Sequence, residues 1–367
     1  MATKTIGNKE YVRHKTCPIC SSKEQRCVEV FQDSIKQADF CINVTSNKSF
    51  DANGMRTYIH EVSADTRSNP VVRKPRVKKT PKKDIDLQDR VYRYFRHACY
   101  LVQGFYIHED DLKDLQRRGV TKEKAEEWGI FSFPRGKTET AKVNNLLKNQ
   151  FGKDLLKVAG FLKTKKGVTI FRNSTFCWDK KKYVQVEGYF FPYTNIDGKI
   201  EALQYRWTKD VYSKKGKKMR WIWFSSDVSS GSPICYNEVK NPLQQKDDVL
   251  LIAEGGLKGK IVSEKMRLSG LFLAGVNNHA LLIKELKRLE KKTGKKYKLI
   301  IAFDMDKYTN KDTNGYYPVL EAEKSLVEKI KKEGNSVATV EWDAQQGKGL
   351  DDAMLNNPKL NRAYKIC

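Results

Sequence analysis

Residues 248–256 read DVLLIAEGG, and residues 298–306 read KLIIAFDMD. Each stretch is a short apolar run that ends in acidic side chains, which is typical of a strand buried on both faces of a parallel sheet. The sequence predicts further strands at 271–275 and 336–342, separated by helices at 257–266, 280–292 and 317–333. Alternating strands and helices predict an α/β fold with a parallel sheet and right-handed crossovers for the last third of the chain.

Acidic residues lie where these strands end, and sites in such sheets form at the carboxyl ends of strands. Glu254 ends the first strand, and Asp304 and Asp306 follow the third, where a regular strand would place both side chains on one face. Asp351 and Asp352 come after the fourth strand. Carboxylates at one sheet edge repel one another, and a divalent cation such as Mg²⁺ or Mn²⁺ would neutralise them with oxygen ligands. The alternative is that these carboxylates only cap helices.

The positive charge is concentrated in the first two thirds of the chain. The 367 residues include 70 Lys and Arg and 44 Asp and Glu, a net charge of +26. Residues 241–367 hold 23 basic and 17 acidic residues, so about +20 falls on residues 1–240. Such a surplus favours a polyanionic partner, nucleic acid first, unless a lysine-rich genome accounts for it. No apolar run approaches the roughly 20 residues of a membrane span and no signal-peptide core begins the chain, so we expect a cytoplasmic protein without membrane association.

Half of the eight cysteines lie within 25 residues near the N-terminus. A gap of two residues lets the first two thiolates bind one tetrahedral ion, and the next two could close the site from a short strand pair. Disulfides are disfavoured in a reducing compartment, so we expect structural Zn²⁺. Two alternatives remain open, namely His14 in place of the third cysteine and a redox pair formed by the first two. The predicted ligands are Cys17, Cys20, Cys27 and Cys41.

The basic part has three recognisable segments. Residues 73–83 (RKPRVKKTPKK) form a charge run broken by prolines, either an extended linker along a phosphate backbone or a solvated tether. Between 160 and 236 the composition favours β-structure, with a hairpin turn at 195–198 and a basic loop at 214–220. We therefore expect a basic sheet that could support a template. The predicted domains are a zinc-binding ribbon at 1–62, a basic linker at 63–88, a basic α+β subdomain at 89–245 and a catalytic domain at 246–367.

The strand–Glu-Gly and strand–Asp-x-Asp patterns resemble the TOPRIM domain of bacterial-type primases, type IA and type II topoisomerases and some nucleases. The order of ribbon, basic subdomain and TOPRIM domain resembles the primases, as do residues 191–206 (FPYTNIDGKIEALQYR) and 118–128. The resemblance implies a multi-domain α+β protein whose TOPRIM domain is Rossmann-like. The chain ends soon after Asp352, with no room for a helicase-binding domain, so it resembles compact forms from plasmids, phages or mobile elements.

Two positions depart from the family pattern. The zinc ligands look like four cysteines, where primases normally use one histidine and three cysteines. Primases often carry an aspartate four residues after the motif glutamate, and here that residue is Lys258. We expect Lys258 and Lys260 to contact a nucleotide phosphate in place of a metal.

The resemblance implies a DNA-dependent primase that makes short RNA primers on single-stranded DNA by metal-dependent nucleotidyl transfer. Glu254 would be a general base or a metal ligand, and Asp304, Asp306 and Asp352, with Asp351 in reserve, would hold Mg²⁺ or Mn²⁺. The residues expected to contact the template or the triphosphate are Arg206, Arg220, Lys258 and Lys260. The implied partners are single-stranded DNA, nucleoside triphosphates and a separately encoded replicative helicase, in the host cytoplasm for a phage protein. The alternatives are a TOPRIM-type nuclease and a non-catalytic single-strand-binding replication accessory; a type IA topoisomerase is disfavoured because no domain with a nucleophilic tyrosine is evident.

Overall fold

The computed structural model divides into two compact units, one within residues 1–82 and the other within 83–367. It describes residues 3–6, 9–13, 27–32, 35–41, 48–52, 55–61, 84–164, 167–170, 174–177, 181–185, 187–212, 216, 218–239, 248–311, 315–357 and 365–366. The basic run 73–83 and the loop residues 214–215 and 217 lie outside this set. No described helix has the length and apolar character needed to cross a membrane.

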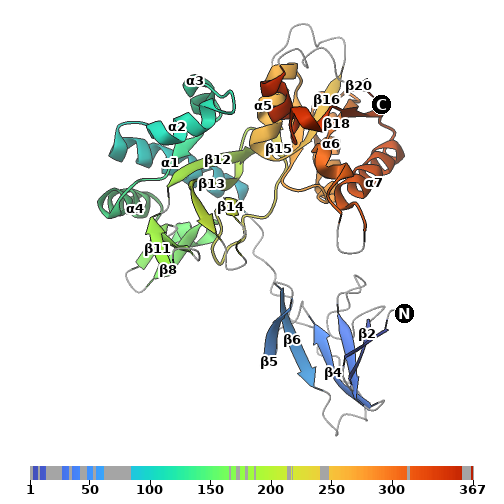
Figure 1. The fold of residues 1–367 in the computed structure, drawn as a ribbon. Coiled ribbons are helices and arrows are strands. Elements are labelled where there is room, and N and C mark those ends of the chain that lie inside the picture. Colours follow the sequence, from blue (N-terminus) through green and yellow to red (C-terminus); the bar gives the residue numbers. More distant parts are fainter. Residues whose placement is uncertain are drawn as a thin grey trace. The chain divides into compact units, whose positions relative to one another are not determined.

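The first unit contains one antiparallel sheet with the strand order β1-β2-β3-β4-β6-β5 (Figure 1). Its strands are β1 (Thr3–Ile6), β2 (Lys9–Arg13), β3 (Val28–Gln32), β4 (Ile35–Cys41), β5 (Lys48–Ala52) and β6 (Met55–Glu61).

Two cysteines of the predicted zinc site lie in this sheet. In the pairing of β3 with β4, Val28 lies opposite Phe40, so the same register continued by one residue places Cys27 opposite Cys41. Both cysteines are buried. The other candidate ligands lie outside the described residues: Cys17, Cys20 and His14. The zinc site therefore stays a prediction, with two of its four cysteines at the same end of a strand pair.

The second unit begins with helices that pack on a small antiparallel sheet of order β14-β13-β12-β7 (Figure 1). The helices are α1 (Ile85–Gln103), α2 (Glu109–Gln116), α3 (Lys122–Glu127) and α4 (Lys137–Phe151), and a 3₁₀ helix spans Gly152–Lys157. The strands are β7 (Phe131–Ser132), β12 (Gly188–Thr194), β13 (Ile200–Tyr212) and β14 (Lys218–Trp223). Two separate hairpins pair β8 (Phe161–Thr164) with β9 (Gly167–Ile170), and β10 (Ser174–Cys177) with β11 (Lys182–Gln185). The core between α1 and the sheet is aromatic, with Phe95 against the rings of Phe131, Phe190 and Phe224.

The last third forms a six-stranded sheet of order β15-β17-β16-β18-β19-β20. Its strands are β15 (Cys235–Asn237), β16 (Val249–Glu254), β17 (Gly270–Leu273), β18 (Lys298–Ala302), β19 (Val337–Glu341) and β20 (Lys365–Ile366). The four central strands are parallel, as predicted, whereas the edge strands β15 and β20 are antiparallel to their neighbours. The sheet is therefore mixed, because short edge strands enter it from segments outside the alternating strand–helix pattern.

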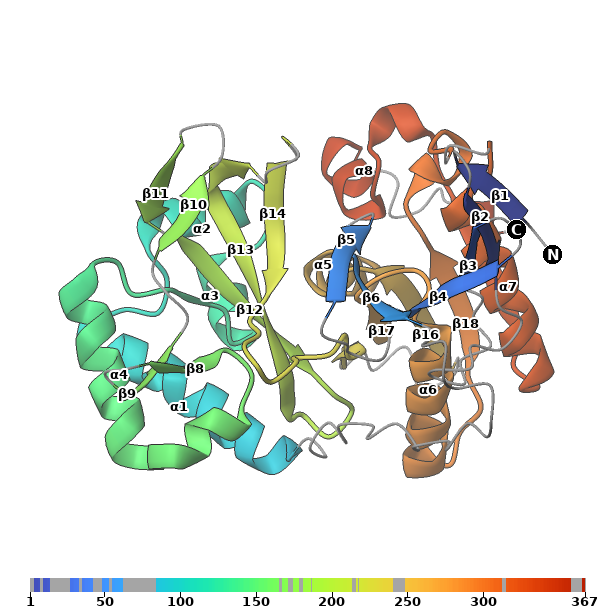
Figure 2. The ribbon, with the colours of Figure 1, turned by 90° about the horizontal axis from the view of Figure 1, so that it is seen from below.

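Helices cover both faces of this sheet (Figure 2). They are α5 (Gly256–Met266), α6 (His279–Thr293), α7 (Pro318–Lys332) and α8 (Leu350–Asn356). Leu250 and Ile252 pack in one cluster with apolar residues of α6 and α7, while Leu251 and Ala253 pack in another with those of α5 and α8. Successive strand residues point to opposite faces, so a strand covered on both faces must be apolar throughout.

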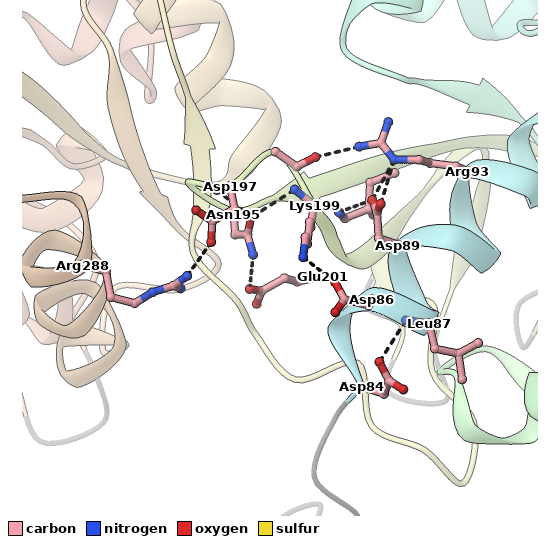
Figure 3. Close-up of polar contacts among 12 residues, drawn as sticks. Asp84, Asp86, Leu87, Asp89, Arg93, Asn195, Asp197, Lys199, Glu201 and Arg288 are labelled. Atoms are coloured by element: carbon pink, nitrogen blue, oxygen red, sulfur yellow. Dashed lines mark hydrogen bonds and ion pairs between the residues drawn. The ribbon is translucent and has the colours of Figure 1, made fainter. Parts of the chain in front are cut away.

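The hairpin between β12 and β13 contacts both α1 and α6 (Figure 3). The Asn195 side chain organises the turn by accepting hydrogen bonds from the backbone N–H groups of Asp197 and Lys199, at 2.9 and 3.0 Å. Asp197 then pairs with Arg288 of α6 at 2.7 Å, and Arg93 of α1 donates to the Gly198 carbonyl at 2.7 Å. The predicted turn is confirmed, and it connects α1 to α6.

Candidate active site at the carboxyl ends of the parallel strands

Acidic side chains of the last third gather where the parallel strands end. β16 ends at Glu254, Asp304 stands two residues beyond β18, and α8 carries Asp351 and Asp352 in its first turn. A cavity of about 420 Å³ opens beside them. It is lined by Arg118, Tyr193, Gln204, Arg206, Arg220, Trp221, Glu254, Gly255, Gly256, Leu257, Lys258, Ala274, Lys348 and Asp352. Residues from the four-stranded and the six-stranded sheets therefore line one cavity.

The Asp304-x-Asp306 pair is arranged differently from the prediction. β18 ends at Ala302, and Asp306 belongs to a 3₁₀ helix over Met305–Tyr308, so the two side chains do not leave one face of a strand. The expectation of a regular strand through Asp306 was wrong, because the chain turns at Asp304. Lys348 brings the two carboxylates together, with its Nζ 2.7 Å from Asp306 Oδ2 and 3.5 Å from Asp304 Oδ2.

Lys258 is, after Lys348, the second lysine that lies among these carboxylates. Its Nζ lies 2.8 Å from Asp304 Oδ2 and 3.1 Å from Oδ1. Desolvation disfavours the ammonium, but Asp304, Asp351 and Glu254 together raise the pKa of Lys258 above its ordinary value. The lysine is therefore charged and fixed on Asp304, while its predicted contact with a nucleotide phosphate stays a prediction.

Among the described residues, the other three carboxylates, those of Glu254, Asp351 and Asp352, form no such ion pair. Desolvation and the neighbouring Asp304 raise the pKa of Glu254, and desolvation likewise raises the pKa of Asp351. Asp351 is only 1% exposed, and neither of its carboxylate oxygens has a hydrogen-bond partner among the described residues. Leaving a buried carboxylate unpaired is costly, and the raised pKa of both groups reflects that cost.

Because Gly349 has no Cβ, these groups can approach its backbone closely. A Cβ atom there would overlap Asp351 Oδ1 and would lie 3.3 Å from both Asp304 Oδ1 and Lys258 Nζ. Carboxylate oxygens are the ligands that Mg²⁺ and Mn²⁺ prefer. As the side chains stand, no three acidic, histidine or cysteine residues in the described part converge closely enough to hold a metal, since Lys258 and Lys348 reach in between them.

Two arginines of the predicted site line the same cavity. Arg206 is buried, donates to Asp114 Oδ2 at 2.7 Å and lies 5.3 Å from the ring centre of Trp221. Arg220 is exposed on β14. A neighbouring cavity of about 350 Å³ shares Arg206, Arg220, Arg118 and Asp352 with the first. A basic surface therefore continues from the carboxylates along β13 and β14.

Sequence reasoning missed two cationic residues of this site. Lys348 stands between two glycines just before α8, and Arg118 lies in the turn that follows α2. Lys348 could have been suspected from its position close to Asp351 and Asp352. Arg118 lies more than a hundred residues from the carboxylates in sequence, so only the folded chain could bring it there.

Lys260 does not belong to this site. It is 5% exposed, its Nζ lies 5.8 Å from the ring centres of Trp128 and Phe191, and it lines a separate cavity of about 430 Å³. Residues two apart on a helix point in nearly opposite directions, so α5 cannot direct both Lys258 and Lys260 to the carboxylates. The structure thus separates the two lysines that the sequence had grouped.

Comparisons with known proteins agree with this architecture. A family described as a domain of unknown function (DUF3854) matches residues 247–360. No curated protein matches the sequence. The RNA polymerase domain of Mycobacterium tuberculosis primase DnaG, solved with double-stranded DNA, is 14% identical over 74% of this chain and 75% of that chain, with a TM-score of 0.50.

The same Mycobacterium tuberculosis domain, solved with a double-stranded DNA oligomer that has a 6-nucleotide overhang, is 14% identical. The match covers 74% of this chain and 78% of that chain, with a TM-score of 0.50. The zinc-binding and RNA polymerase domains of Aquifex aeolicus primase are 14% identical to this chain. That match covers 100% of this chain and 81% of that chain, with a TM-score of 0.46. The second unit therefore has a fold like that of the catalytic domain of a bacterial-type primase.

Proposed function

We propose that this protein is a DNA-dependent primase that joins ribonucleotides into short RNA primers on single-stranded DNA. The observation that carries the proposal is the cavity at the strand ends, where Glu254 and Asp352 of the acidic cluster line the same cavity as Arg118, Arg206 and Arg220. Template and triphosphate are polyanions that require neighbouring positive charge. Phosphoryl transfer also requires side chains, here carboxylates, that can hold a divalent metal. The fold shared with primase catalytic domains supports the same conclusion.

The residues of the chain have distinct tasks in this reaction. Arg220 is exposed and binds phosphate groups, while Arg206 is held in place by Asp114 and Trp221. Glu254, whose pKa is raised by burial, accepts the proton of the attacking 3′-hydroxyl. Asp304, Asp306 and Asp352, with Asp351 in reserve, would hold Mg²⁺ or Mn²⁺, and the ion would lower the pKa of that hydroxyl and offset charge at phosphorus.

The proposal extends to the first unit and to the partners. Structural Zn²⁺ bound by Cys17, Cys20, Cys27 and Cys41 would support a ribbon that helps to select the start site, and the burial of Cys27 opposite Cys41 supports this assignment. Nucleoside triphosphates are the proposed substrates. The protein would act as a compact replication protein of a mobile element, alongside a separately encoded helicase.

One incubation separates the candidate functions. The full chain is mixed with single-stranded DNA, labelled ribonucleoside triphosphates and Mg²⁺ or Mn²⁺, and the products are resolved on a denaturing gel. A primase gives short labelled RNA that depends on metal and template. A nuclease shortens the DNA without triphosphates, and a binding accessory gives no product with either metal.

The Asp304→Asn, Asp306→Asn double variant tests the role of the carboxylates. We expect it to abolish primer synthesis, because amides cannot replace the negative charge that holds the metal. Asp248→Asn is the matched control, because Asp248 precedes β16 at the opposite end of the same sheet and pairs with exposed Lys295. Circular dichroism melting verifies that both variants fold, and full activity of the folded double variant would contradict the assignment.

A further inference from the structure

The cavity of about 430 Å³ that Lys260 lines is a place of its own in the second unit, because it shares no lining residue with the cavity at the carboxylates. Its walls come from α1, the end of α3, the hairpin of β12 and β13, β15 and α5. The volume lies within the range of sites for small organic ligands. Helices and strands therefore border a cavity of ligand size outside the proposed active site.

Lys260 is a buried cation of this cavity without a counter-anion in the chain. Its side chain is 5% exposed, and within the described part of the chain no hydrogen bond or ion pair reaches its Nζ. The carboxylates that act on it from a distance, Glu127 and Glu264, both pair with Lys124, at 2.8 and 3.4 Å. Water can accept a hydrogen bond from an ammonium, but it does not neutralise the charge. Burial of an unbalanced cation is costly, so the position favours an anion from outside the chain.

Arg96 is a second cation of the same cavity that lacks an acidic partner. One of its terminal nitrogens donates to the Glu126 carbonyl at 2.8 Å, and its guanidinium lies 4.1 Å from the ring centre of Tyr106. Among the described residues no carboxylate lies within ion-pair distance of Arg96, and its buried Nε has no hydrogen-bond partner. Nε1 of Trp128, another lining residue, is likewise a buried donor without an acceptor in the described part of the chain. The polar groups left unsatisfied in this lining are thus donors.

The other charged groups of the lining are paired or exposed. Arg93 pairs with Asp89 at 2.8 Å and donates to the Gly198 carbonyl (Figure 3). Glu127 is exposed and pairs with Lys124, and Glu238 is exposed, so water solvates both carboxylates. Lys260 and Arg96 are therefore the two cations of this cavity that the described part of the chain leaves unbalanced.

We propose that this cavity binds a small molecule through a doubly charged phosphoryl group, which Lys260 and Arg96 would hold. A phosphate monoester carries close to two negative charges at neutral pH and offers three acceptor oxygens, so it matches two cations with free donors. Inorganic phosphate shares this chemistry. The size of the cavity favours the ester, because Pro192, Ile196 and Ile200 supply apolar wall for an organic body.

Calorimetric titration of the full chain with inorganic phosphate, adenosine monophosphate and acetate tests the proposal. The titrations contain no divalent metal, so that the proposed catalytic centre does not contribute. We expect both phosphoryl probes to bind, the monophosphate more tightly. Acetate should bind at least about tenfold more weakly than the monophosphate, because a single negative charge balances one cation only.

Two variants remove the cations in turn. Lys260→Met and Arg96→Met keep the apolar stems of the side chains, and each should weaken binding of the phosphoryl probes by about tenfold or more. Lys260→Met removes a buried charge, so we expect it to fold at least as stably as the native protein. Its loss of binding would therefore not arise from unfolding, whatever the stability of the Arg96 variant.

Controls separate this cavity from general attraction to a protein of net charge +26. Lys284→Met, on the exposed side of α6, and Arg220→Gln, in the cavity at the carboxylates, should leave the affinity unchanged. The proposal is overturned if neither phosphoryl probe binds at millimolar concentration, if Lys260→Met binds as the native protein does, or if the controls weaken binding equally. Binding is measured without template or triphosphates, so this proposal and the proposed function stand or fall separately.

Discussion

Lys258 and Lys260 lie two residues apart on α5 and occupy opposite environments. Lys258 is paired with Asp304, and its pKa is raised. Lys260 is buried between Trp128 and Phe191 without an ion pair among the described residues, and desolvation lowers its pKa. The same residue type is thus stabilised as a cation at one position and destabilised at the other.

Lys260→Met should stabilise the protein by about 1–3 kcal/mol at neutral pH, because it removes a buried charge that no carboxylate balances and keeps the apolar volume. Thermal or urea unfolding measures the difference. Lys284→Met on the exposed side of α6 is the control and should change stability by less than about 0.5 kcal/mol.

The gain from Lys260→Met should depend on pH in one direction. The folded pKa of Lys260 lies below the unfolded value near 10.5, so the unfolded chain binds more protons between the two values. The stability of the native protein therefore rises with pH across that window, and the advantage of the variant shrinks. A constant advantage up to pH 10.5 would contradict this account.

Glycines set how closely α5 approaches the sheet. Gly259 lies against the ring of Phe272 on β17, and Gly256 lies 2.6 Å from Phe191 Cε1, measured from the position a Cβ would take. These contacts let the helix carry Lys258 close to the strand ends. A larger residue at either position would push α5 away from Asp304.

Gly259→Ala should therefore destabilise the second unit by about 1–3 kcal/mol through overpacking. Alanine also brings a gain of about 1 kcal/mol to a helix, so the net destabilisation is up to about 2 kcal/mol. Gly275→Ala is the control, because nothing lies within 4 Å of a Cβ there. Equal unfolding midpoints for the two variants would show that α5 can shift freely.

On the scale of the whole molecule, the chain folds as two compact units. The first unit contains the four predicted zinc ligands, Cys17, Cys20, Cys27 and Cys41. A small domain built around a structural metal commonly depends on that metal for its stability.

Calorimetry should therefore show two unfolding transitions, and a zinc chelator should abolish the one that belongs to the first unit. Cys17→Ser should reproduce the effect of the chelator, and Cys367→Ser should not. If the chelator leaves both transitions in place, the stability of the first unit does not depend on zinc.

The sequence alone determined the alternating strands and helices of the last third, the 195–198 hairpin turn and the positions of the acidic residues. These features depend on periodicity and turn chemistry over a few neighbouring residues, which a sequence displays directly. It could not determine that the chain turns at Asp304, that the edge strands run antiparallel, or that Lys260 faces a different cavity from Lys258. Nor could it place Arg118 and Lys348 at the carboxylates. Those facts depend on packing between residues far apart in the chain, and only the tertiary structure decides which charges meet.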